Sequence, residues 1–245
     1  MQTVLKKPSS PTLLGKSSTS PIDQRKRKEV KVHVRKKVAI FYIGGAGDKR
    51  KFVPLPEFIA GPFRNILDAK SQVDLRTIEI RKKKLLVDFW RGYYEIFGEK
   101  NIEKNVIQYI PDKSVPIIII GHSLGGWNGA HLSSILSKKG YSVEMLVTLD
   151  PVGQGNIVSA TSDIYNEVPT PIANYWINIL ANPKADNFSD FIADFGEQWN
   201  IKSGPQINST VDVNHADAGI MFRLPISEKK SALDLVHKKI LELTK

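Results

Sequence analysis

A serine, an aspartate and a histidine, met in that order along the chain, have the residue types that nucleophilic catalysis requires. Ser123 is the centre of a G-x-S-x-G pentapeptide, residues 121–125, which reads Gly-His-Ser-Leu-Gly. Glycines two residues before and after a serine permit a turn so tight that the hydroxyl projects clear of the backbone. The hydroxyl attacks a carbonyl carbon only when a base takes its proton and an acid orients that base. We predict that His215 is the base and Asp150 the acid.

The segments that flank Ser123 have the composition of a buried strand followed by a helix. Residues 115–120 read Val-Pro-Ile-Ile-Ile-Ile, a run too apolar for a strand with one face in water. After residue 126 apolar residues recur at helical spacing until Lys-Lys-Gly at 138–140, which is typical of a helix end. Strand, sharp turn, serine and helix form the context that a nucleophile elbow requires. The N-terminal amides of the helix would point towards an oxyanion formed at Ser123.

Asp150 is predicted to lie at the same edge of the sheet as Ser123. Residues 142–149 (S-V-E-M-L-V-T-L) predict a strand that ends directly before Asp150, and the 27 residues from Ser123 to Asp150 suit one helix and one strand. A right-handed crossover of that length makes the two strands parallel, so their carboxyl ends open on the same side. The plainer interpretation is an aspartate that starts a turn before proline. Asp212 and Asp217 are local alternatives as the orienting acid.

Five histidines are available as the base: His33, His122, His131, His215 and His237. Only His215 follows a strand-like segment, residues 211–213, at a place after the acid, which completes the order Ser, Asp, His of this arrangement. His122 is adjacent to the serine, so we expect its side chain to point elsewhere. His131, two turns along the predicted helix, is expected to be structural.

A glycine-rich loop near the start of the chain is a candidate for the oxyanion site. Residues 38–43 (V-A-I-F-Y-I) predict a buried strand, and residues 44–48 (G-G-A-G-D) follow it. The third glycine of a dinucleotide fingerprint is absent. We expect one oxyanion donor to be the amide of Leu124 and the other to be that of Gly45 or Ala46. A simple strand-to-helix turn is the alternative.

Several motifs resemble those of lipases and lipase-like serine esterases of the α/β-hydrolase superfamily. Residues 121–126 are similar to the G-H-S-L-G-G elbow of these enzymes, and residues 149–151 to the L-D-P of pancreatic-type lipases. The match is weaker at Val-Asn-His, residues 213–215. The I-G-G-A-G loop at 43–47 departs from the usual His-Gly pair. The resemblance implies an α/β-hydrolase fold, with a mostly parallel central sheet and helices on both faces.

Two long segments around these motifs are harder to interpret. Residues 87–97 are rich in aromatic side chains and suit a strand or an amphipathic helix, and residues 101–110 favour a helix. Residues 181–209 carry Asp186, Asp190 and Asp194 at intervals of four. The spacing matches no metal-ligand motif, so we expect a solvated helix face or a loop there. The long insertions at 153–174, which is polar and turn-rich, and at 181–209 are candidates for a lid or an acyl-chain wall.

The positive charge of the chain is concentrated near its beginning. Residues 1–37 contain 11 Lys/Arg and 2 acidic residues, whereas the rest has 24 basic and 23 acidic residues. We predict a disordered basic tail over 1–28 and a catalytic domain over 29–245. The tail favours contact with anionic membranes over nucleic acid, because it has no aromatic residue for base stacking. Without an apolar signal segment or membrane span, the chain is expected to be cytoplasmic or exported without a Sec signal.

The sequence therefore predicts a serine hydrolase of carboxylic esters, which acts through an acyl-enzyme. We expect a lipase or esterase, and phospholipids are included among its candidate substrates. No cofactor or metal is expected, and the expected partner is a small or lipid ester. Acyl transfer or thioester hydrolysis by the same triad is an alternative within enzymes. The alternative that is not an enzyme is a hydrolase-fold protein without catalytic activity, which binds anionic membrane or nucleic acid through its basic tail.

Overall fold

The computed structural model describes residues 37–48 and 65–245. The predicted tail at 1–28, an edge strand suggested by the alternating valines at 30–34 and most of a short helix predicted at 58–66 lie outside the described residues.

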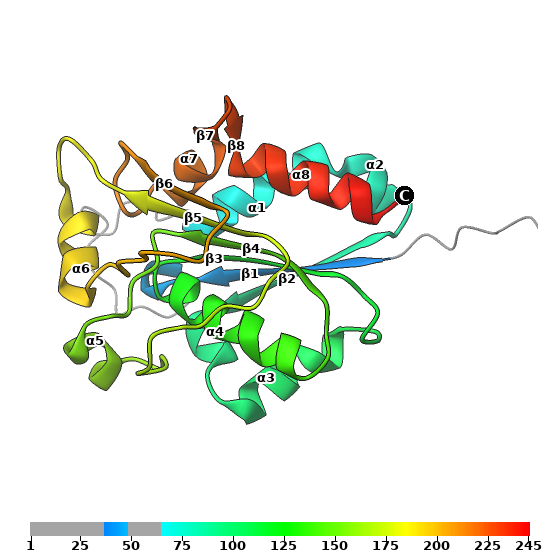
Figure 1. Ribbon diagram of the computed structural model, residues 1–245, viewed down its shortest axis with the longest axis horizontal. Helices are drawn as coiled ribbons and strands as arrows, with labels where there is room; N and C mark the ends of the chain where they lie inside the picture. The colour runs from blue at the N-terminus through cyan, green and yellow to red at the C-terminus, as the bar shows by residue number, and fades with distance from the viewer. Residues whose placement is uncertain (1–36, 49–64) are drawn as a thin grey trace, which may run out of the picture. The chain divides into compact units, whose positions relative to one another are not determined.

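A six-stranded sheet in the order β2-β1-β3-β4-β5-β6 forms the centre of the described chain, and all its pairs are parallel (Figure 1). Its strands are β1 (Val38–Gly44), β2 (Leu86–Gly92), β3 (Ile117–His122), β4 (Val143–Leu149), β5 (Trp176–Ala181) and β6 (Ile207–Val211). A separate antiparallel hairpin is formed by β7 (Pro225–Ser227) and β8 (Lys230–Ser231). The predicted parallel sheet is confirmed.

Helices cover both faces of the sheet, as predicted (Figure 1). The α-helices are α1 (Asn65–Arg76), α2 (Ile78–Lys82), α3 (Glu99–Asn105), α4 (Leu124–Lys138), α5 (Asn156–Thr161), α6 (Phe188–Gly196), α7 (Ala218–Arg223) and α8 (Ala232–Leu243). Helices α1, α7 and α8 pack together on one face, whereas α4 covers the other beside α3. Short 3-10 helices are η1 (Ala46–Asp48), η2 (Tyr93–Ile96) and η3 (Ile107–Tyr109).

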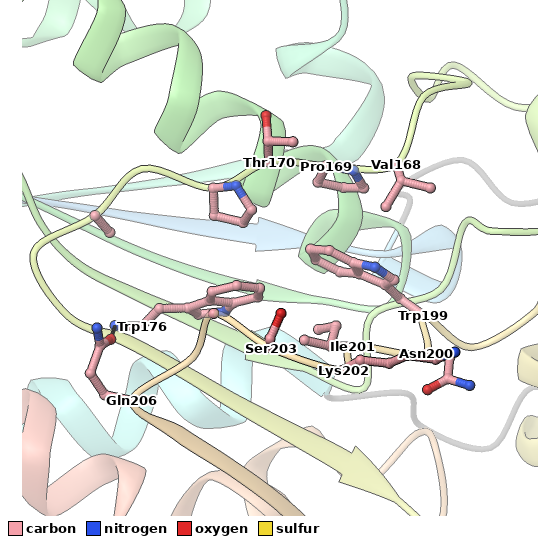
Figure 2. Close-up of a pocket in the computed structure, with 13 residues that line it drawn as sticks. Val168, Pro169, Thr170, Trp176, Trp199, Asn200, Ile201, Lys202, Ser203 and Gln206 are labelled. Carbon is pink, nitrogen blue, oxygen red and sulfur yellow. Dashed lines mark hydrogen bonds between the residues drawn. The ribbon is translucent and has the colours of Figure 1, made fainter.

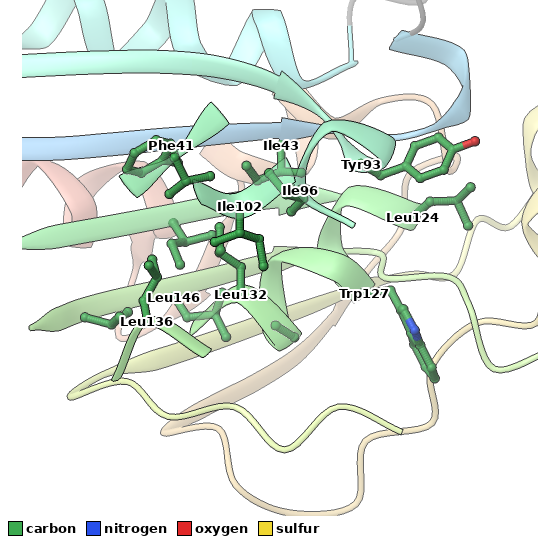
Figure 3. Close-up of a cluster of buried hydrophobic side chains, with 14 of the residues drawn as sticks. Phe41, Ile43, Tyr93, Ile96, Ile102, Leu124, Trp127, Leu132, Leu136 and Leu146 are labelled. Carbon is green, nitrogen blue, oxygen red and sulfur yellow. The ribbon is translucent and has the colours of Figure 1, made fainter. Parts of the chain in front are cut away.

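Successive residues of the central strands enter different halves of the core, which explains their unbroken apolar runs. In β1, Phe41 and Ile43 join the cluster under α4, whereas Ile40 and Tyr42 join the cluster under α1 and α8. Figure 3 shows the α4 side, where Phe41 and Ile43 lie near side chains from α4. Because both faces are covered by helices, alternation between apolar and polar residues is absent.

The segments that the sequence left ambiguous resolve into short elements. Residues 86–92 form the edge strand β2, and the aromatic stretch then continues as η2 rather than as a longer helix. The helix predicted at 101–110 ends at Asn105, and η3 follows it. No helix among the described residues is long and apolar enough to cross a membrane.

Candidate active site

Ser123 occupies a sharp turn between β3 and α4. Its φ of 55° lies in the left-handed region that residues with a Cβ rarely adopt. A Cβ on Gly121 would lie 2.3 Å from the carbonyl oxygen of Gly125, and one on Gly125 would lie 2.3 Å from that of Ile43. The two glycines of the pentapeptide are therefore required by backbone crossings, as the sequence predicted.

The structure brings Ser123, His215 and Asp150 into one chain of hydrogen bonds. The distance from His215 Nε2 to Ser123 Oγ is 3.0 Å, and that from His215 Nδ1 to Asp150 Oδ2 is 2.6 Å. All three residues are buried, with 7%, 6% and 1% of their surfaces exposed for Ser123, His215 and Asp150. The geometry is that of a nucleophile, a base and an orienting acid.

The pairing of β3 with β4 explains why Ser123 and Asp150 meet. These strands are parallel neighbours with His122 opposite Leu149, so the next residue of each lies just beyond the same edge. The amide of Ser123 donates to Leu149 O at 3.1 Å, which extends the pairing into the elbow.

The second carboxylate oxygen of Asp150 is also hydrogen-bonded, and neither of its partners was predicted from the sequence. Asp150 Oδ1 accepts hydrogen bonds from the amide of Ala181, at 2.8 Å, and from Gln198 Nε2. Gln198 lies in the segment between α6 and β6, 48 residues from Asp150. No local pattern in the sequence marks it, since its role depends on the folding of that segment over the end of β5.

Asp190 corrects the expectation of a solvated acidic face at residues 186–194. It is 8% exposed and its Oδ1 accepts from the backbone amide of His215 at 2.7 Å. Its Oδ2 accepts from the amide of Asn187, at 2.8 Å, and from Asn214 Nδ2, at 2.6 Å. The asparagine-capped start of α6 thus holds the loop that carries His215. The capping pattern Asn-x-x-Asp was visible in the sequence, but its contact with residue 215 was not.

His122 corrects a second expectation, because its side chain does not point away from the site. Its ring lies 4.8 Å from that of His215, centroid to centroid. Its Nε2 lies 2.8 Å from the backbone oxygen of His215, and because a carbonyl only accepts, this nitrogen is the donor. His215 is therefore held through its amide by Asp190 and through its carbonyl by His122.

Burial lowers the pKa of the His215 imidazole from the ordinary histidine value of 6.5. The hydrogen bond with Asp150 acts in the opposite direction, and the nearby His122 adds to the lowering. The imidazole is consequently neutral at pH 7, the form in which Nε2 can accept a proton from the serine.

The glycine-rich loop after β1 borders the serine. A Cβ on Gly45 would lie 2.6 Å from the Cβ of Ser123, so these two residues are in direct contact. The amide of Gly45 donates to Asp48 Oδ2 at 2.9 Å. Leu124, the residue after Ser123, is the first residue of α4. The three predicted oxyanion residues, Gly45, Ala46 and Leu124, thus belong to the two segments that meet at Ser123.

The remaining acidic candidates take other roles. Asp212 forms an ion pair with Lys184 at 2.9 Å, and Asp217 precedes the first turn of α7. The contact with the imidazole is made by Asp150. Among residues 37–48 and 65–245, no group of three or more His, Cys, Asp or Glu is arranged to hold a metal ion.

A surface pocket of about 470 Å³ is lined in part by Trp176 and Trp199 (Figure 2). Trp176 and Trp199 stack in it with ring centroids 5.5 Å apart, and Pro169 and Thr170 lie opposite. Trp176 is the first residue of β5, whereas Ser123 follows the last residue of β3. Ser123, Asp150 and His215 do not line this pocket.

No protein-family model and no curated protein matches the chain. Among solved structures, the type II thioesterase YbtT of the yersiniabactin NRPS/PKS biosynthetic pathway is 11% identical, with a TM-score of 0.41. The match covers 86% of this chain and 95% of that one. Six parallel strands in this order, a serine elbow after β3 and helices on both faces give the chain the α/β-hydrolase fold.

Proposed function

We propose that the protein is a serine hydrolase of carboxylic esters, a lipase or esterase. The observation that carries this proposal is the buried hydrogen-bond chain from Ser123 Oγ through the His215 imidazole to Asp150. A serine with a purely structural role would not need a strained backbone or two flanking positions where any Cβ would clash with the backbone. It would also not need a neutral imidazole hydrogen-bonded to its hydroxyl.

In the proposed reaction Ser123 Oγ attacks the ester carbonyl while His215 Nε2 takes its proton. Asp150 fixes the tautomer with Nδ1–H bonded to Oδ2 and stabilises the imidazolium that forms. The imidazolium then gives the proton to the leaving alcohol, and the acyl group stays on Ser123. Water, deprotonated by the same imidazole, releases the acid and regenerates the serine. Ser123, His215 and Asp150 therefore supply the nucleophile, the proton transfers and the charge stabilisation of every step.

The oxyanion of the tetrahedral intermediate is assigned to two backbone amides. The amide of Leu124 lies at the N-terminus of α4, where the helix dipole favours negative charge. For the second donor we favour Ala46 over Gly45, because the Gly45 amide is already bonded to Asp48. Each such donor contributes about 3 kcal/mol where it has been removed in other enzymes.

Turnover of p-nitrophenyl esters by wild type and Ser123→Ala tests the proposal. We expect the variant to lose about six orders of magnitude in kcat. Ser71→Ala, an exposed serine on α1, is the matched control and should keep wild-type turnover. Equal turnover by wild type and Ser123→Ala would refute the proposal.

The same triad can attack a thioester, so the assay includes an acyl thioester of equal chain length. An ester hydrolase should show the higher kcat/KM on the oxygen ester. A strong preference for the thioester would replace ester hydrolysis with the thioesterase alternative and leave the assigned triad unchanged.

A further inference from the structure

Helix α6 exposes a row of large apolar side chains. Phe188, Phe191, Ile192 and Phe195 are 54%, 67%, 44% and 57% exposed, respectively. They stand at positions i, i+3, i+4 and i+7, so they form one stripe on a single helix face. A contiguous exposed apolar surface of this kind marks an interaction site. We call these four residues the α6 stripe.

The opposite face of the same helix belongs to the candidate active site. Ser189, Asp190 and Ala193 are buried beneath it, and Asp190 bonds the amide of His215. Helix α5 contacts α6 and adds Ile157, which is 57% exposed. Figure 1 shows α5 and α6 beside each other at the end of the sheet towards which the strands point, where Ser123 lies.

The charges around the α6 stripe limit its partner. Helices α5 and α6 contain no lysine or arginine, whereas the exposed Asp194 lies between Phe191 and Phe195 and the exposed Glu197 follows the helix. An anionic surface would be repelled by these acids. A second copy of the chain, stripe against stripe, would bring like acids together. A lipid surface without net charge is not repelled by these acids and does not bring like charges together. It also needs no polar groups that match those of the helix.

We propose that the α6 stripe docks the protein on a zwitterionic lipid surface, with the mouth of the Ser123 site at that surface. The phenylalanine rings would enter the boundary between headgroups and acyl chains, where apolar area is removed from water. The docking step stands without catalysis. Its use, to present lipid esters to Ser123, rests on the proposed function.

Vesicle binding by the catalytically inactive full chain tests the docking separately from the chemistry. Ser123→Ala is cosedimented with phosphatidylcholine vesicles at low and high salt, alone and combined with Phe191→Ser and Phe195→Ser. We expect salt-insensitive binding that falls about tenfold or more for each serine substitution. Phe191→Leu should restore most of it, because leucine keeps the apolar area.

Leu75→Ser is the matched control, since Leu75 is 71% exposed on α1, on the face of the sheet away from α4. It should bind as Ser123→Ala does, and circular dichroism should show that each variant is folded. Absence of binding to phosphatidylcholine would overturn the proposal, as would binding equal in the α6 and Leu75 variants. A stripe-dependent dimer in sedimentation velocity, without vesicle binding, would assign the α6 stripe to a second copy instead. If the vesicles are bound but the wild-type chain hydrolyses no ester, the docking proposal stands and the proposed function is refuted.

Discussion

His215 is fixed at three points, which makes its position more precise than a surface loop would allow. Its imidazole lies between Ser123 and Asp150, its amide donates to Asp190 and its carbonyl accepts from His122. Supporting hydrogen bonds of this kind hold a base within hydrogen-bond distance of the nucleophile whose proton it takes.

Asp190→Asn should slow catalysis although residue 190 does not touch the nucleophile. Both carboxylate oxygens of Asp190 accept from donors, and an amide NH2 in place of one oxygen would face a donor. We expect kcat/KM to fall by roughly tenfold to a hundredfold, since small displacements of a base are costly.

Asp194→Asn, an exposed acid on the same helix, is the control and should leave kcat/KM unchanged. A positioning role further predicts that Asp190→Glu, which keeps the charge, recovers part of the loss while the circular dichroism spectra stay alike. Wild-type kcat/KM in Asp190→Asn would contradict it.

The acidic limb of the pH profile should lie below the usual range for histidine. Burial lowers the pKa of His215 from 6.5, and the base must be neutral to act. The midpoint of the acidic limb should therefore lie below pH 6.5, with activity lost as the pH falls through the pKa of His215. A profile of kcat/KM against pH measures this, and an apparent pKa above 6.5 would show that Asp150 outweighs burial.

At the scale of elements, the elbow depends on close contact between β1, β3 and α4. Gly125→Ala would place a Cβ 2.3 Å from the Ile43 oxygen and 2.7 Å from its carbon, both backbone atoms that cannot move alone. We expect unfolding free energy to fall by at least about 1–3 kcal/mol, as for other overpacked sites. Urea denaturation measures the change.

Gly129→Ala supplies the matched control within the same helix. There a Cβ would meet Ile119 Cγ2 at 3.4 Å and Ile43 Cγ1 at 3.8 Å, which are ordinary contacts. Alanine should stabilise the helix interior by about 0.5–1 kcal/mol. Equal effects of the two substitutions would show that the elbow is not sterically constrained.

Much of this element-scale arrangement follows from local sequence. The isoleucine run, the two glycines and the strand before Asp150 specify β3, the elbow and β4, because burial, steric crossing and crossover length are local constraints. Asp190, Gln198 and His122 were missed or misjudged because their roles arise from segments packed against each other far along the chain. The stretch from 87 to 97 was ambiguous because aromatic residues suit β2 and η2 equally.

At the scale of the whole molecule, the charge and the chemistry are separated along the chain. Residues 1–37 carry a net charge of +9 and the remainder +1, and Ser123, Asp150 and His215 all belong to the remainder. The two segments predict two different modes of membrane contact, one electrostatic and one apolar through the α6 stripe.

Replacement of the Arg25–Lys28 run by glutamine should weaken binding to phosphatidylglycerol vesicles and leave binding to phosphatidylcholine unchanged. Each basic residue contributes about 1 kcal/mol near an anionic surface at low salt, so four replacements should have a large effect that high salt removes. Cosedimentation measures both arms. An equal loss on the two vesicle types would show that the charge separation has no functional meaning.

Covalent labelling of the full chain by a fluorophosphonate tests the central claim most directly, because the probe reacts only with a serine that is activated as a nucleophile. The account predicts one adduct per chain, located on Ser123 by mass spectrometry, absent in Ser123→Ala and slower in Asp190→Asn. Absence of an adduct on the folded wild-type chain, or equal labelling of Ser123→Ala, would contradict it.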